Sequence, residues 1–303
     1  MSYLLVGGCS WSHLEYKATS PEDDVSFPKW SEHLAEYLDV MLVSVARSGS
    51  GNFFQYSQLM EYILSDNPPK YLCWQLSEAG RRHIDGGKGF IKLPYQSIYN
   101  KDNHHYQTLD ELVKDLKDYS QGIHLSAAQK TKIKHAYDEF YALDNKPLLL
   151  IDENFKRIYQ IKKLCEMMGI KFFIFCSDVP FYSLAHENPN IEIYNSLKLF
   201  INLSRYRSNK NIDDVDPLAV YHNIIAMKSF KKIDKNSKGI YGWPFYEEFG
   251  GNYIDVVHNR EKNSGGKYLW DYTISKDDIH PNGAGHLKLF NKLLPLLQKE
   301  WDI

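Results

Sequence analysis

Short apolar runs that end in glycine, serine or polar sequence alternate with segments of helical periodicity along much of the chain. The apolar runs predict buried strands over residues 3–7, 40–46, 70–76 and 170–176. The periodic segments predict helices over residues 27–38, 53–64, 152–168 and from about 282 onward. Strands that are apolar throughout belong to sheets covered on both faces. The alternation therefore predicts a mostly parallel sheet in a three-layer α/β/α sandwich.

Two segments, at about 83–147 and 178–260, do not fit this alternation. The first has polar sequence rich in Tyr and His, followed by two predicted helices near 108–118 and 125–142. The second combines a predicted helix near 191–204 with irregular aromatic sequence. We expect one domain over residues 1–303, with both segments inserted over the strand ends, where ligands bind in such sheets.

Charge and hydropathy exclude several classes of partner. The net charge of −2 over 303 residues provides no basic field for nucleic acid. No apolar stretch reaches the roughly 18 residues of a membrane span, and the N-terminus lacks the features of a signal peptide. We therefore expect a cytoplasmic protein without nucleic-acid or membrane partners. The pattern does not indicate an oligomeric state.

Cysteine and histidine spacing argues against a metal site or a disulfide framework. The four cysteines stand alone without C-x-x-C spacing, so we expect reduced thiols in the core. His104 and His105 are adjacent, and adjacent side chains point apart on a helix or strand. We therefore expect a solvated loop there and not a metal site. We expect no metal and no cofactor. The 22 tyrosines suit sugar contacts, although tyrosine is equally common at half-buried positions.

Four polar loops fall at corresponding ends of the predicted elements. Residues 6–12 place Ser10 in the turn after the first strand, and residues 48–52 carry Gly49 after the second. Residues 76–81 follow the third strand, and residues 277–282 precede the last helix. Because parallel strands end at one edge of a sheet, we expect these loops to converge there.

These loops resemble the motifs of the SGNH/GDSL hydrolases, which carry a Gly-Asp-Ser turn after the first strand and an Asp-x-x-His near the C-terminus. Gly8-Cys9-Ser10 stands at the turn, with Cys9 replacing the usual Asp. Asp277-Asp278-Ile279-His280 matches the second motif, and residues 280–286 resemble the family's His-Pro-x-x-x-Gly-His ending. The resemblance covers roughly residues 1–82 and 265–300. It implies a flavodoxin-like SGNH hydrolase fold and ester hydrolysis.

The resemblance also implies roles for the motif residues. A serine hydroxyl needs an imidazole to take its proton, and a carboxylate holds that imidazole in the right tautomer. Ser10 would be the nucleophile, His280 the base and Asp277 the orienting carboxylate, at an offset of three residues. Asp278, at an offset of two, would be exposed or cap the last helix.

The oxyanion of acyl transfer requires preorganised donors. The backbone N–H groups of Ser10 and Gly49 match two of the family's three donors. The family's third donor, an Asn side chain, falls at Ala79, which has no side-chain donor. Substitute donors in the same stretch are Gln75, Ser77 and Arg81, of which we favour Ser77 or Gln75.

Two polar residues are candidates for substrate binding. Arg81 carries a fixed charge that would favour an anionic group of the substrate. Asn52 would line the site or cap the helix that follows it.

Each motif alone has a plainer interpretation. The Gly-Gly-x-Ser could be a simple turn or a phosphate-binding loop at a helix N-terminus, and His280 alone could be structural. Taken together, the motifs favour an O-acetyl esterase that acts on a carbohydrate or other small acyl ester through an acyl-Ser10 intermediate. Alternatives are an O-acyltransferase and a non-catalytic module for glycan binding or assembly. A nucleotide-binding protein is a weaker fit, since the chain lacks the Lys-Ser/Thr of a P-loop.

Overall fold

The computed structural model describes part of the chain: residues 2–18, 20–77, 83–85, 90–92, 127–128, 131, 135, 147–176, 226–233, 240–241, 270–275, 278 and 280–303. The helix expected near 191–204, that near 108–118 and most of that near 125–142 lie outside these residues. So do His104 and His105, Ala79, Arg81 and Asp277. The extent of the single domain and of its two insertions therefore stays a prediction.

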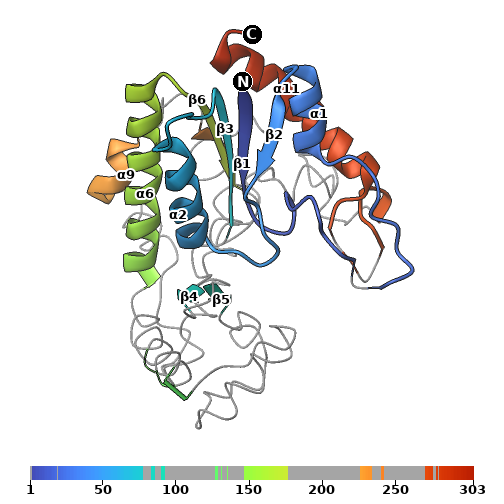
Figure 1. The fold of residues 1–303 in the computed structure, drawn as a ribbon, viewed down its shortest axis with the longest axis horizontal. Coiled ribbons are helices and arrows are strands. Elements are labelled where there is room, and N and C mark those ends of the chain that lie inside the picture. Colours follow the sequence, from blue (N-terminus) through green and yellow to red (C-terminus); the bar gives the residue numbers. More distant parts are fainter. Residues whose placement is uncertain are drawn as a thin grey trace.

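A five-stranded parallel sheet forms the centre of the molecule (Figure 1). Its strands are β1 (Tyr3–Gly7), β2 (Met41–Ser44), β3 (Tyr71–Leu76), β6 (Lys171–Cys176) and β7 (Ile240–Tyr241). Their order is β2-β1-β3-β6-β7. This is the 2-1-3-4-5 order of flavodoxin-like doubly wound sheets. The predicted fold class is confirmed.

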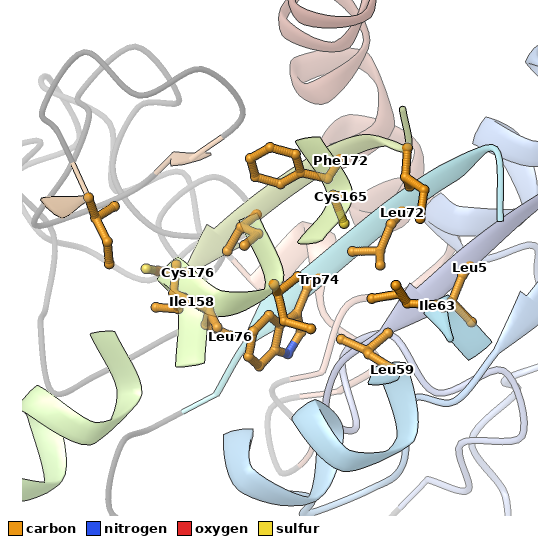
Figure 2. Packing of buried hydrophobic residues seen from close by; sticks show 14 of the residues in the cluster. Leu5, Leu59, Ile63, Leu72, Trp74, Leu76, Ile158, Cys165, Phe172 and Cys176 are labelled. Atoms are coloured by element: carbon orange, nitrogen blue, oxygen red, sulfur yellow. The ribbon is translucent and has the colours of Figure 1, made fainter. Parts of the chain in front are cut away.

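Helices cover both faces of the sheet (Figure 1). On one face, α2 (Asn52–Ile63) and α6 (Pro147–Met168) bury a core cluster against β3 and β6. Figure 2 shows this cluster, with Trp74 between Leu59 of α2 and Ile158 of α6. On the other face, α1 (Trp30–Tyr37) and α11 (Gly283–Trp301) enclose a second cluster that includes Trp30 and Leu293.

Three features were not predicted. β7 lies inside the second expected insertion, so that segment contributes to the main sheet. Within the first, β4 (His83–Asp85) and β5 (Phe90–Lys92) pair as an antiparallel hairpin. A short helix, α9 (Lys228–Lys232), packs on α6 through Phe230 and Phe155, whose ring centroids lie 5.4 Å apart.

The strand register places three loops side by side. Leu5 of β1 aligns with Val43 of β2 and with Leu72 of β3. All three strands run in the same direction, so the loops that begin at Gly8, Val45 and Ser77 leave the same edge of the sheet. The predicted convergence of these loops is confirmed.

The four cysteines are free and buried, as the sequence predicts. Burial raises the pKa of the Cys165 and Cys176 thiols to about 12, and it raises that of Cys73 as well. These thiols are therefore unreactive at neutral pH. No helix in the described ranges combines the length and apolar character needed to cross a membrane.

Candidate functional site

Ser10 and His280 meet at the carboxyl edge of the sheet. Ser10 is half-buried in the loop after β1, and its Oγ lies 2.7 Å from Nε2 of His280. The two residues are 270 positions apart in the chain. The predicted meeting of Ser10 and His280 is confirmed. At this distance the imidazole can take the serine proton directly.

The carboxylate beside His280 is Asp278. Its Oδ1 lies 2.6 Å from Nδ1 of His280, and its side chain is only 1% exposed, against 22% for the imidazole. The expectation that Asp278 would be exposed or would cap the last helix is wrong. The contact predicted for Asp277 is made by its neighbour, while Asp277 itself lies outside the described residues.

Local hydrogen bonds explain why an offset of two residues suffices. The backbone N–H of His280 donates to Asp278 Oδ1 over 3.1 Å, which closes an Asx turn. That turn holds the carboxylate oxygen beside the backbone of His280 and beside its ring. The backbone N–H of Asp278 is bonded in turn to Ser275 Oγ at 3.1 Å.

The segment before α11 holds this turn against the last helix. Ile274 N–H donates to His280 O over 2.8 Å, and Thr273 forms an antiparallel bridge with Pro281. Asn282 is the N-cap of α11, since its Oδ1 accepts from the N–H of Gly285. Its Nδ2 also donates to the carbonyl oxygen of Thr273 over 2.9 Å. The cap residue therefore also anchors Thr273, which precedes the Asx turn.

Tyr16 also contacts His280, and this contact was not predicted. Its Oη lies 2.9 Å from Asp278 Oδ2 and 2.8 Å from His280 Nδ1. The phenol and imidazole rings have centroids 4.2 Å apart, tilted by 32°. The indole of Trp11 flanks the same imidazole at 5.5 Å. No sequence signal distinguishes Tyr16 from the other tyrosines of the chain.

A buried amide joins the loops after β1 and β2. Gln55 of α2 is fully buried; its Oε1 accepts from the N–H of Gly8 at 2.9 Å and its Nε2 donates to Ser50 Oγ at 2.6 Å. Ser50 Oγ in turn donates to the carbonyl oxygen of Gly8 at 2.8 Å. This ring of three bonds fixes the spacing between the two loops. The sequence signal was a glutamine on the buried face of a periodic helix.

Gly49 sits in a tight turn with a backbone conformation that suits glycine. Its φ is +70°, and Ser50 N–H donates to Arg47 O over 3.0 Å, as in a type II turn with glycine third. Within the part of the chain that the structure describes, the N–H groups of Gly49 and Ser10 have no hydrogen-bond partner. Among the described residues, both groups could therefore donate to a ligand.

Of the two favoured substitutes for the third donor, Ser77 makes another hydrogen bond and Gln75 is fully buried. Ser77 Oγ donates to the carbonyl oxygen of Ser50 at 2.9 Å. Gln75 is fully buried, and its Oε1 accepts a bond from Ser12 Oγ, which itself accepts from Trp30 Nε1 at 3.0 Å. Ser77 Oγ therefore braces the loops from inside, whereas Gln75 Nε2, the donor group of that side chain, is buried without a hydrogen-bond partner among the described residues. Arg81 lies outside the described residues.

Asn52 serves the same bracing. Its Nδ2 donates to Ser77 O at 2.8 Å, and its Oδ1 accepts from Ser77 N–H at 2.7 Å. This two-way clasp joins the start of α2 to the end of β3. The residue is 5% exposed and does not cap α2, whose N-cap is Gly51. Its amide is thus satisfied by protein groups.

A cavity of about 540 Å³ adjoins the loops after β1 and β2. Residues 13–15 and 44–47 form one part of its lining, together with Phe54, Gln58 and Tyr62 of α2. His13 Nδ1 lies 3.0 Å from Ser48 Oγ, next to Gly49. The Arg47 guanidinium lies over Phe54, with its carbon 5.8 Å from the ring centroid. The backbone N–H of Arg47 donates to Gly8 O at 3.0 Å. The cavity thus brings polar groups near the loop that carries Ser10.

The described residues hold no group of three or more His, Cys, Asp or Glu side chains arranged for a metal ion. The described residues at this edge include a serine hydroxyl, an imidazole, a carboxylate and the backbone N–H groups of Ser10 and Gly49.

Comparisons with known proteins give similarity at the level of structure alone. No protein-family model and no curated protein sequence matches the chain. One similar solved structure is a protein assigned to the G-D-S-L family of lipolytic proteins, from Desulfitobacterium hafniense DCB-2. It has 10% identity and a TM-score of 0.39, and the match covers 98% of this chain and 99% of that one.

Two further solved structures are similar to the same degree. TesA has 13% identity and a TM-score of 0.38 over 98% of this chain and 99% of its own. The lipase Lip_vut3 from a goat rumen metagenome has 12% identity and a TM-score of 0.37, over 98% and 97%. At such TM-scores the likeness carries no weight for the site, whose chemistry rests on the residues described above.

Proposed function

We propose that this chain is a divergent serine esterase of the SGNH/GDSL hydrolase type, with Ser10, His280 and Asp278 as its catalytic residues. The observation that carries the proposal is the continuous chain of contacts from Ser10 Oγ to His280 Nε2 at 2.7 Å and from His280 Nδ1 to Asp278 Oδ1 at 2.6 Å. Nucleophile, base and orienting carboxylate thus stand in the order that acyl transfer requires.

The proposed reaction proceeds in two halves. Ser10 Oγ attacks the ester carbonyl carbon while its proton passes to His280 Nε2, and the carbonyl oxygen becomes an oxyanion. The backbone N–H groups of Ser10 and Gly49 donate to that oxyanion. The intermediate collapses to acyl-Ser10, and the alcohol leaves with the proton from His280. Water then attacks the acyl carbon while its proton passes to His280 Nε2. The bond to Ser10 Oγ breaks, the carboxylic acid leaves, and His280 returns the proton to Ser10 Oγ.

Asp278 has an electrostatic part in each half. Its buried carboxylate holds the Nδ1–H tautomer of His280, so that Nε2 faces Ser10 as a proton acceptor. When the imidazolium forms, the carboxylate lies 2.6 Å from the new charge. The first half-reaction therefore creates an ion pair where a neutral imidazole stood beside a carboxylate.

The cavity lined by His13 of the Ser10 loop and by Arg47 supports a proposal for the substrate class. Its volume of about 540 Å³ lies within the usual range for small-molecule sites. His13, Arg47 and Gln58 offer hydrogen-bonding groups, and Tyr62 offers an aromatic face, which together suit a hydroxyl-rich ligand. We assign the cavity to the sugar part of a carbohydrate ester, with the acyl group at Ser10. The acyl group that we propose is acetyl.

The proposal is tested by the hydrolysis of p-nitrophenyl acetate. Ser10→Ala and His280→Ala are expected to lower kcat by about 10⁴–10⁶-fold, as for other serine hydrolases. Ser57→Ala is the matched control and should retain full activity, because the Ser57 hydroxyl is exposed and bonds the Phe53 carbonyl oxygen of its own helix. A wild-type protein without activity on any acyl ester would overturn the proposal in favour of a glycan-binding module.

A further inference from the structure

The phenol of Tyr16 lies against both partners of the acid–base pair. Its Oη is 2.9 Å from Asp278 Oδ2 and 2.8 Å from His280 Nδ1, and its ring faces the imidazole at a centroid distance of 4.2 Å. Tyr16 belongs to the loop that carries Ser10 and lies 262 residues before Asp278 in the chain. The same loop therefore supplies the nucleophile and a support for its base.

The directions of the hydrogen bonds follow from the chemistry of the groups. A carboxylate only accepts, so the Tyr16 hydroxyl donates its proton to Asp278 Oδ2. The Nδ1–H of His280 donates to Asp278 Oδ1 at 2.6 Å, and Tyr16 Oη is its second acceptor at 2.8 Å. Each oxygen of the carboxylate thus has a donor. The lone pair of Nε2 is left toward Ser10.

The buried position of Asp278 makes the phenol's donation important. A carboxylate that is 1% exposed receives little stabilisation from water, so each protein donor counts. Oδ1 is already fixed by the backbone N–H of His280 at 3.1 Å. Oδ2 is held by Tyr16, which prevents rotation of the carboxylate away from the ring. The tilted stacking limits rotation of the imidazole in the same way.

From this geometry we infer that Tyr16 is a positioning residue for the His280–Asp278 pair. It holds the carboxylate and the imidazole in the orientation in which Nε2 meets Ser10 Oγ. Because its hydroxyl contacts the carboxylate and the imidazole, it acts through these two neighbours. The inference rests on the proposed function for its kinetic consequence, but the orientation itself is a property of the folded protein.

Tyr16→Phe is the sharpest variant, because it keeps the ring and removes the hydroxyl. On p-nitrophenyl acetate we expect kcat to fall about 10- to 100-fold with KM unchanged. This factor corresponds to the loss of one hydrogen bond to a charged group. Tyr37→Phe is the matched control. Tyr37 lies on α1 and is bonded to Gln298, and its variant should match the parent. Equal kcat for Tyr16→Phe and the parent would overturn the inference.

A second readout does not require activity. The Nδ1 proton of His280, held by Asp278, should give a low-field proton NMR signal that His280→Gln removes. In Tyr16→Phe we expect this signal to shift or broaden, because the ring and the carboxylate gain freedom. A signal of unchanged position and width would contradict the inference. If the parent protein hydrolyses no ester, the proposed function fails, and the NMR signal alone decides the role of Tyr16.

Discussion

Asp278 binds His280 twice: its Oδ1 accepts from the backbone N–H at 3.1 Å and lies 2.6 Å from the ring nitrogen Nδ1. The Asx turn thus performs two tasks with one oxygen. It sets the backbone that presents the imidazole, and it fixes the tautomer of that imidazole. We therefore predict that Asp278, and not its neighbour Asp277, is essential.

The matched pair Asp278→Asn and Asp277→Asn tests this prediction. Replacing Asp278 by an amide should lower kcat by about 10⁴-fold, because the amide no longer selects the Nδ1–H tautomer. Asp277→Asn should lower kcat less than Asp278→Asn does. Steady-state kinetics on p-nitrophenyl acetate, with circular dichroism as the check on folding, gives the comparison. The opposite ranking of the two variants would show that the register of the pair is incorrect.

Two glycines with the same backbone conformation separate strain from catalysis. Gly49 has φ +70° in the loop beside Ser10, and Gly169 has φ +68° after α6, with open space where a Cβ would stand. Alanine at either position should cost about 1–2 kcal/mol of unfolding free energy. Gly49→Ala should also lower kcat, because the shifted turn misplaces an oxyanion donor, whereas Gly169→Ala should leave kcat unchanged. Equal kcat values for the two variants would show that Gly49 is not an oxyanion donor.

Stability should fall with acid through a histidine in the core. His286 of α11 is buried, its Nδ1 accepts from the N–H of Trp30 at 3.3 Å, and burial lowers its pKa well below the usual 6.5. Below about pH 6.5 the unfolded chain binds a proton there that the folded protein does not. The free energy of unfolding therefore decreases as the pH falls below that value toward the lower pKa of the folded protein, by up to about 1.4 kcal/mol per pH unit.

Urea denaturation between pH 7.5 and 5 checks this linkage. In His286→Gln, the slope of the unfolding free energy against pH should fall by up to about 1.4 kcal/mol per pH unit, which corresponds to one proton. The exposed His135 provides the control, and His135→Gln should keep the parental slope. The prediction fails if His286→Gln shows the same slope as the parent protein.

Arg47 should distinguish sugar esters from simple esters. Its guanidinium stacks over Phe54 at the cavity that we assign to the sugar. In Arg47→Met we expect KM for an acetylated monosaccharide to rise about 10-fold or more, because a hydrogen bond from a charged group to the sugar is lost. The kcat/KM for p-nitrophenyl acetate should stay within about twofold of the parent value.

The control for Arg47→Met is Arg157→Met. Arg157 stacks over Phe53 in a similar way, 4.8 Å from the ring centroid, but from α6. Its loss should change neither substrate's kinetics. An unchanged KM for the sugar ester in Arg47→Met would exclude the cavity as the sugar site.

The core of the fold could be predicted because its signals are local. Leu4, Leu5 and Val6 form an apolar run and are fully buried in β1, as such a run predicts. β7 could not be found, since two residues carry no periodicity. Its place in the sheet depends on packing against β6.

The site was predictable only in part, for a related reason. Ser10 and His280 stand in motifs whose order along the chain indicates their meeting. The choice of Asp278 depends on an Asx turn, and offset counting does not detect such turns. The contact of Tyr16 depends on two distant loops meeting in space. Gln75 and Ser77 have the right chemistry for donors, but the Ser77 hydroxyl is bonded to Ser50 O, and Gln75 is fully buried.

The proposed chemistry requires that Ser10 is a nucleophile activated by His280. The most direct measurement is mass spectrometry of the protein after treatment with a fluorophosphonate, which phosphonylates activated serines. We predict one adduct on the peptide that contains Ser10, no adduct in Ser10→Ala, and strongly slowed labelling in His280→Ala. Labelling at Ser12 or Ser48, or labelling that persists unchanged in Ser10→Ala, would contradict this role of Ser10.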